Sequence, residues 1–345
     1  MSTTHEEITV ALQEEIPADN LKDLIDASLY MPFPFQSNRH ESESAAGVDA
    51  WLRTCGLTDD PAVAAMIAKT RPAELASYNS PTVDRDVLQI VANQIAYQFI
   101  FDDLAEEVGR RRPGRLLPML SESIGILRDG QAPVTPLGVA LADLHRQVQE
   151  RCTPAQAARW AWNSREYVHG LLYEAVAQAH TPPVRMGLCN SIRSLTAGIE
   201  PFYPLYEAAQ PCELAPEDLH HATMRRLRRL SVDAAVWIAD LFSSVKEQRT
   251  GGIINLALAY QRAVRLFAAA GRHAGHPTDQ QHHRRVRDAL REDQAGAEPG
   301  RRRLRGRHVR LDSRVLLLVP HRAALRGRGG DVLRPLTADQ SNYVT

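Results

Sequence analysis

Apolar residues recur at three- and four-residue spacing along most of the chain up to about residue 262, which places them on one face of an α-helix. Several of these segments begin with Thr or Asp followed by Pro or acidic residues, as amino-terminal caps do. No alternating strand pattern persists, and no tandem repeat is found. We therefore predict an all-α fold, with helices over residues 45–57, 84–108, 135–152, 153–180 and 217–252.

The second of these helices changes character along its length. The stretch "QIAYQFIFDDLAEE", residues 94–107, is almost wholly apolar at first and acidic at the end. In a helix Asp102 and Glu106 share a face, with Asp103 one step around. Carboxylates crowded in this way repel each other unless a cation lies among them, and Mg²⁺ prefers such oxygen ligands and often shares its remaining positions with phosphates. The alternative interpretation is a helix end that surfaces into water with solvated acids.

A second acidic face occurs in "WIADLFSSVKEQRTGG", residues 237–252. Asp240, Ser243 and Glu247 stand at i, i+3 and i+7 and share one helical face, which predicts a second cation site. Lys246 and Arg249 beside them offer positive charge for a phosphate. Two acidic helices with cations between them, together with basic side chains, are what ionisation of a diphosphate ester requires.

In their order and spacing, these motifs resemble bacterial class I terpene synthases. Asp102-Asp103-Leu104-Ala105-Glu106 looks like the family's aspartate-rich motif, and Ser243 and Glu247 match the later two positions of its metal-binding triad. "NSIRSLTAGIEP", residues 190–201, resembles the stretch that carries the diphosphate-sensing arginine, here Arg193, followed by a helix break around Thr196-Ala197-Gly198. The resemblance implies a class I terpene synthase α-helical bundle with a central apolar cavity over residues 31–262.

The resemblance also implies an activity, that of a lyase ionising an isoprenoid diphosphate and cyclising the carbocation. Farnesyl diphosphate, the commonest substrate in the bacterial family, is expected, while geranyl and geranylgeranyl diphosphates stay open. Three Mg²⁺ ions are expected, held by Asp102, Asp103, Glu106, Asp240, Ser243 and Glu247. Arg193 and Lys246 would act as catalytic groups that neutralise the diphosphate, and Arg249 would help to bind it.

Aromatic side chains are expected around the cation, because aromatic faces attract positive charge. Tyr97, Phe99 and Trp237 are the substrate-binding residues that we predict. Further candidates are Phe101, Trp160, Trp162 and Tyr167. The alternative for each is ordinary core packing.

The chain departs from the family at two places. Ala239 stands where a metal-binding asparagine is usual; we predict that Asp240 takes over, the alternative being a weakened second site and an impaired enzyme. After residue 262 the family's final helices and its closing arginine–tyrosine pair are not recognisable, and no lysine follows Lys246. We interpret residues 263–345 as an Arg-rich tail of doubtful fold, with a shifted reading frame as the hypothesis. Residues 1–30 form an N-terminal segment.

Composition limits the other functions. The 345 residues have a formal net charge of +0, the N-terminus lacks the features of a secretory signal, and no apolar run is long enough to span a bilayer. The four cysteines are scattered, with no close pair that suggests a zinc site or a redox motif, so we expect a reduced cytoplasmic protein. A monomer or homodimer is expected. "RRRLRGRHVR" supports a nonenzymatic alternative, a helical protein whose tail binds nucleic acid. That tail has no aromatic interleaving, so nucleic acid is not the expected partner. A chain-elongating prenyltransferase should carry a second Asp-Asp motif, which is missing here.

Overall fold

The computed structural model describes residues 35–109, 112–179, 185–210 and 213–263. All regular structure within these ranges is helical, which confirms the all-α prediction. The helices are α3 (Glu41–Thr54), α4 (Pro61–Thr70), α5 (Pro72–Asn79), α6 (Arg85–Gly109), the 3₁₀ turn η1 (Pro113–Leu116), α7 (Leu117–Asp129), α8 (Pro136–Arg151), α9 (Pro154–Ala179), α10 (Met186–Thr196), α11 (Phe202–Ala208), α12 (Pro216–Leu219) and α13 (Ala222–Thr250).

Helices α6 and α9 form the centre of the bundle, and α6 packs against α5, α8 and α9. Its first turn is capped by Asp84, whose Oδ1 accepts hydrogen bonds from the backbone N–H groups of Asp86 and Val87 at 3.1 and 3.0 Å. From Val87 to Phe101 most side chains of α6 are buried, and the exposed acids follow. The helix therefore carries its acidic end out of the core, as the sequence pattern indicates.

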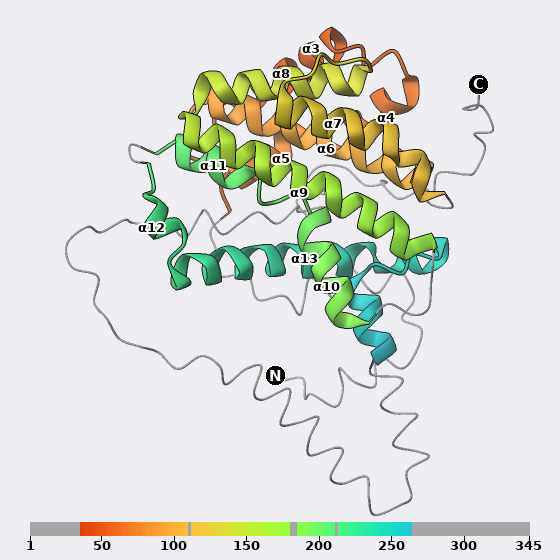
Figure 1. Ribbon diagram of the computed structural model, residues 1–345. Coiled ribbons are helices and arrows are strands. Elements are labelled where there is room, and N and C mark those ends of the chain that lie inside the picture. Colours follow the sequence, from red (N-terminus) through yellow and green to blue (C-terminus); the bar gives the residue numbers. More distant parts are fainter. Residues whose placement is uncertain (1–34, 110–111, 180–184, 211–212, 264–345) are drawn as a thin grey trace, which may run out of the picture.

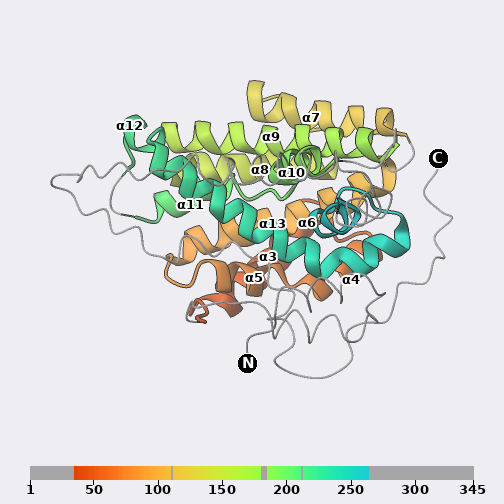
Figure 2. The same ribbon diagram turned by 90° about the horizontal axis from the view of Figure 1, so that it is seen from below.

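The helices that carry the predicted motifs meet at one end of the molecule. Figure 1 shows α6, α7, α8 and α9 side by side, with the long α13 beneath them and α10 crossing in front. The view from below agrees that α13 runs along the bundle past α6 and α10 (Figure 2). The carboxyl-terminal ends of α6, α9 and α13 all lie toward the right in Figure 1.

The segment predicted as one helix over 217–252 is interrupted. His221 has an extended backbone (ψ 140°), and its Nδ1 accepts a hydrogen bond from the Thr223 N–H at 3.3 Å, so a new helix begins there. The pattern of apolar residues missed this boundary because a single extended residue barely shifts their spacing. Helix α13 ends at Thr250 and is capped by Gly251, whose φ of +78° is a left-handed conformation that glycine adopts without strain.

The helix break predicted around Thr196-Ala197-Gly198 is confirmed. Helix α10 ends at Thr196, Gly198 takes φ +63°, and α11 starts at Phe202. An added Cβ at Gly198 would also lie 2.7 Å from Gln98 Nε2, so both the backbone conformation and the close approach of α6 favour glycine there.

The described helices include none with the length and apolar character that crossing a membrane requires. Cys55, Cys152 and Cys189 are buried free thiols within the described part of the chain, while Cys212 lies outside it. The N-terminal segment 1–30 also lies outside the described residues, as does the Arg-rich tail with its proposed frame shift, apart from its first residue, Ala263.

Candidate active site

The acidic end of α6 brings several carboxylates into one electrostatic environment. Asp102, Asp103 and Glu106 are all solvent-exposed. Asp102 nevertheless stands among closely surrounding protein, and this desolvation, followed by the charge of Glu174, raises its pKa to about 7. Arg193 acts in the opposite direction. A cation nearby would stabilise the ionised form of such a carboxylate.

Arg193 lies beside these acids from the last turn of α10, and its partner is Asp240 of α13. Nη2 and Nε of Arg193 donate to Asp240 Oδ1 at 2.7 and 3.0 Å, and Nη1 donates to Thr196 Oγ1 at 2.9 Å. The side chain of Asp240 is 1% exposed and that of Arg193 is 17% exposed. Burial alone lowers the Arg193 pKa, but the charges of Asp240, Glu174 and Asp102 outweigh it and raise that pKa. The guanidinium is therefore held charged among the carboxylates of Asp102, Glu174 and Asp240, which together with Asp103, Glu106 and Glu247 are called the acidic cluster below.

These contacts bear on the prediction that Asp240 ligates a metal ion. Its second oxygen, Oδ2, accepts a hydrogen bond from the backbone N–H of Leu256 at 2.7 Å. Both carboxylate oxygens therefore already have donors, and the group is closed off from solvent. The metal role of Asp240 stays a prediction, and this geometry weighs against it.

Ser243 and Glu247 meet on the same face of α13. Ser243 Oγ donates to Glu247 Oε1 at 2.8 Å and accepts from Asn255 Nδ2 at 3.1 Å. Burial raises the pKa of Glu247, whereas the Ser243 hydroxyl and Arg193 lower it, and Glu106 of α6 is near enough to add to the rise. Charges from both acidic motifs, on α6 and α13, and from Arg193 therefore act on Glu247 together.

Glu174 of α9 belongs to the same cluster and was missed from the sequence. Its carboxylate hydrogen-bonds the Thr196 hydroxyl, and Arg193 lowers its pKa, yet burial outweighs both and leaves that pKa raised. Glu174 stands alone, without the second acid that marks a motif. Its only signal is its register: it follows Tyr167 and Leu171 at i+7 and i+3, on the inward stripe of α9.

The ligand atoms that these residues offer can be compared with those that Mg²⁺ prefers. Within residues 35–109, 112–179, 185–210 and 213–263, no three Asp, Glu, His or Cys side chains converge closely enough to hold a metal ion alone. The donors facing each other are carboxylate and hydroxyl oxygens, which are the ligands Mg²⁺ takes, usually one or two per ion with substrate phosphates supplying the rest. The donor set therefore fits Mg²⁺ shared with a phosphorylated substrate.

The basic residues predicted beside the second motif lie at the surface. Lys246 and Arg249 are both exposed on the last turns of α13. Their positions next to Glu247 are compatible with contact to a bound anion, and no described contact tests that prediction.

The aromatic candidates fall into distinct environments. Tyr97 and Phe101 are buried with ring centroids 5.4 Å apart, and Phe101 lies 6.1 Å from Tyr167. Phe99 and Trp237 are partly buried against the core, with Trp237 edge-on to Tyr260 at 6.3 Å.

The two tryptophans of α9 differ. Trp160 is 1% exposed and donates from Nε1 to Gln94 Oε1 at 2.8 Å. Trp162 is 56% exposed under the Arg165 guanidinium, 4.8 Å from its ring centroid. The prediction that Trp162 lines an interior cavity is therefore wrong. Trp162 follows Trp160 by two residues, and a step of two residues along a helix places a side chain on a different face.

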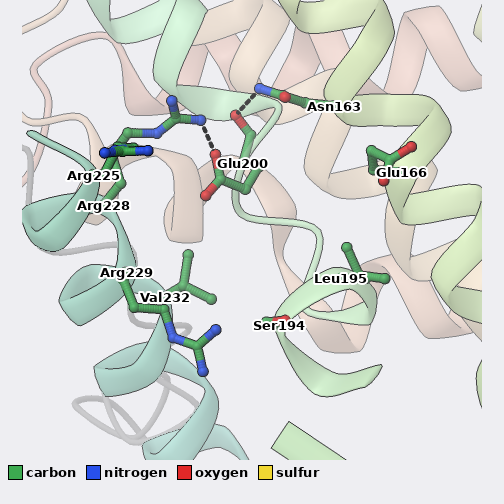
Figure 3. A pocket seen from close by; sticks show the side chains of 9 residues that line it. All are labelled: Asn163, Glu166, Ser194, Leu195, Glu200, Arg225, Arg228, Arg229 and Val232. Atoms are coloured by element: carbon green, nitrogen blue, oxygen red, sulfur yellow. Dashed lines mark hydrogen bonds and ion pairs between the residues drawn. The ribbon is translucent and has the colours of Figure 1, made fainter. Parts of the chain in front are cut away.

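A hollow of about 360 Å³ lies elsewhere, along the amino-terminal half of α13 (Figure 3). Arg225, Arg228 and Arg229 line one side of it, and Glu166 lies on the other. Arg228 forms an ion pair with Glu200, and Arg229 forms one with Asp233 of its own helix. The hollow contains none of the residues of the acidic cluster, so we place the chemistry at the cluster.

Comparison with known proteins defines the class to which this site belongs. Residues 94–269 match the family model described as terpene synthase family 2, C-terminal metal binding. The chain belongs to this family of terpene synthases.

Individual terpene synthases show how similar this chain is to known members of the family. Over 270 residues the chain is 77% identical to the (-)-alpha-amorphene synthase ((2E,6E)-farnesyl diphosphate cyclizing) of Streptomyces viridochromogenes, covering 78% of this chain and 80% of that one. It is 29% identical over 241 residues to the (-)-beta-caryophyllene synthase of Saccharothrix espanaensis, covering 68% and 67%. The crystal structure of germacradien-4-ol synthase from Streptomyces citricolor superposes with a TM-score of 0.60 at 26% identity, covering 69% of this chain and 76% of that one.

The Arg193–Asp240 pair leads to a stability prediction. Asp240→Asn leaves the Arg193 charge largely buried without its counter-ion, which costs about 3 kcal/mol. We expect the melting temperature, measured without Mg²⁺, to fall by roughly 5–10 °C. Asp233→Asn on the same helix breaks a more exposed ion pair, with Arg229, and should change the melting temperature by about 2 °C or less. An Asp240→Asn protein as stable as the wild type, but needing more Mg²⁺, would instead support the metal role.

Proposed function

We propose that this chain is a Mg²⁺-dependent cyclase that ionises farnesyl diphosphate and cyclises the carbocation to a sesquiterpene, releasing diphosphate. The substrate follows from the 77% identical relative, whose name specifies cyclisation of (2E,6E)-farnesyl diphosphate. (-)-α-Amorphene is accordingly the product that we propose to test first. A cytoplasmic location remains part of the proposal.

The observation that carries the proposal is the meeting of two acidic helix faces around one charged arginine. The positive charge of Arg193 lowers the pKa of both Asp102 on α6 and Glu247 on α13. Carboxylates attract metal ions and repel an anion, whereas Arg193 attracts the anion directly. A diphosphate with its cations satisfies both requirements at once, which neither a neutral ligand nor a bare anion does.

Each group of residues then has its own role in the proposed reaction. Asp102, Asp103, Glu106, Ser243 and Glu247 hold three Mg²⁺ ions, which when bound supply neutralisation of the diphosphate. Arg193 contacts and orients the diphosphate oxygens, with Lys246 and Arg249 adding charge at the rim. Asp240 holds the Arg193 guanidinium in place rather than a cation. The aromatic side chains Tyr97, Phe99 and Trp237 keep water from the hydrocarbon part.

Removal of metal tests the magnesium requirement. Diphosphate release from farnesyl diphosphate should stop in EDTA and return when Mg²⁺ is added in excess. Geranyl and geranylgeranyl diphosphates, assayed in parallel, should be turned over more slowly. Release that continues in EDTA would contradict the metal-dependent mechanism, and preference for geranylgeranyl diphosphate would replace the substrate.

Ala239 offers a gain-of-function prediction. Ala239 precedes Asp240 on α13 and stands four residues before Ser243, so an amide there adds an oxygen to the face of Ser243 and Glu247. If Asp240 serves Arg193, the site lacks one ligand, and Ala239→Asn should lower the Mg²⁺ concentration for half-maximal activity about three- to tenfold. Ala234→Asn, also on α13 but exposed and more than two turns from Ser243, is the control. An unchanged Mg²⁺ requirement in Ala239→Asn would mean that the site is already complete.

A further inference from the structure

The break between α10 and α11 is held by side chains from two other helices. Gln98 of α6 donates from Nε2 to the carbonyl oxygen of Gly198 at 2.9 Å. Asn163 of α9 donates from Nδ2 to the carbonyl oxygen of Glu200 at 2.9 Å (Figure 3 shows the second contact). Carbonyls beyond the last turn of a helix lack an intrahelical donor, and the Gln98 amide supplies one to Gly198. The Asn163 amide adds a second donor to the Glu200 carbonyl, which also accepts from the backbone N–H of Tyr203 at 3.3 Å.

Gln98 connects the break directly to the acidic helix. It lies one turn before Asp102 on α6, and its amide contacts a residue two positions after Thr196. Thr196 in turn accepts from Arg193 and hydrogen-bonds Glu174. A chain of contacts therefore runs from α6 through the break to the Thr196 hydroxyl and the Arg193 guanidinium.

The contact is also close enough to define one arrangement. Gly198 has a φ of +63°, and a Cβ atom added to it would lie 2.7 Å from the amide nitrogen of Gln98. The Gly198 N–H donates to the Leu195 carbonyl at 3.1 Å and closes the end of α10, and the hydrogen bond from Gln98 holds the carbonyl of the same glycine against α6. Without it the last turn of α10 has one fewer restraint on its distance from α6.

We propose that Gln98 is a positioning residue for ionisation: by holding the Gly198 carbonyl, it sets the register of the last turn of α10, and so of Arg193, against Asp102. The proposal rests on the function proposed above. It requires nothing of Gln98 toward the substrate, since the effect is transmitted through the backbone of the break.

Gln98→Met tests the proposal, because methionine keeps the length and volume of the side chain but cannot donate. With farnesyl diphosphate and Mg²⁺ we expect kcat to fall about tenfold, the size of one lost hydrogen bond, while KM changes by less than about threefold. Hydrogen exchange of the backbone amides over residues 196–203 should rise in the substrate-free protein. Gln98→Glu, which cannot donate when ionised, should behave in the same way.

Gln94→Met is the matched control, since Gln94 lies one turn earlier on α6 and bonds Trp160 instead of the break. It should leave exchange over 196–203 at the wild-type level. Wild-type exchange in both Gln98 variants, or raised exchange with wild-type kcat, overturns the positioning role. A wild-type protein that does not turn over farnesyl diphosphate overturns the proposed function instead, and the exchange measurement still decides whether Gln98 holds the break.

Discussion

Asp102→Asn is expected to lower turnover of farnesyl diphosphate by at least about a thousandfold while leaving the helical content unchanged. An amide is a far weaker ligand for Mg²⁺ than a carboxylate, and it removes one negative charge from the cluster facing Arg193. Because Asp102 is solvent-exposed and its pKa is raised to about 7, its ionised form adds little to folding, so stability should not fall. Circular dichroism and a diphosphate-release assay measure the two quantities.

Asp86→Asn is the control for this change. Asp86 is exposed on the first turn of the same helix, at the opposite end from the acidic cluster. It should retain wild-type turnover. An Asp102→Asn protein with full activity would remove the acidic end of α6 from the mechanism.

Arg193→Lys is the second substitution for which we expect a large loss, on the order of a hundredfold or more in kcat. The guanidinium makes four directed hydrogen bonds through its three nitrogens, three to Asp240 and one to Thr196. Lysine preserves the charge, but its single ammonium cannot maintain that fork and also face a diphosphate. Steady-state kinetics together with the melting temperature separate a catalytic loss from a folding loss.

Arg185→Lys provides the comparison, because Arg185 is exposed at the start of the same helix. It should change kcat by less than about twofold. Equal losses in the two variants would mean that the diphosphate sensor is placed wrongly.

The helices and the two acidic motifs could be predicted from the sequence because both depend on local spacing. The apolar run before Asp102 determines which face of α6 is buried, and the same periodicity places Ser243 and Glu247 together. The break at Thr196-Ala197-Gly198 was likewise predictable, though from the family resemblance and not from periodicity.

Contacts between residues on different helices could not be predicted from local spacing. The spacing of Asp240 from Ser243 shows that the two share a face, but not that Arg193 and the Leu256 N–H already occupy the carboxylate. Glu174 gave no motif at all, because it joins the cluster through the packing of α9 on α6 and α10. The contact between Gln98 and Gly198 spans 100 residues and depends on the same packing.

The central claim is that this chain converts farnesyl diphosphate into a cyclic sesquiterpene. Incubation of the purified full-length protein with farnesyl diphosphate and Mg²⁺, followed by gas chromatography–mass spectrometry of the extract, tests it most directly. We predict a cyclic sesquiterpene with the retention time and mass spectrum of (-)-α-amorphene, absent when EDTA is added or when Asp102 is replaced by Asn. Unconverted farnesyl diphosphate, or only acyclic farnesol, with Mg²⁺ present would contradict it.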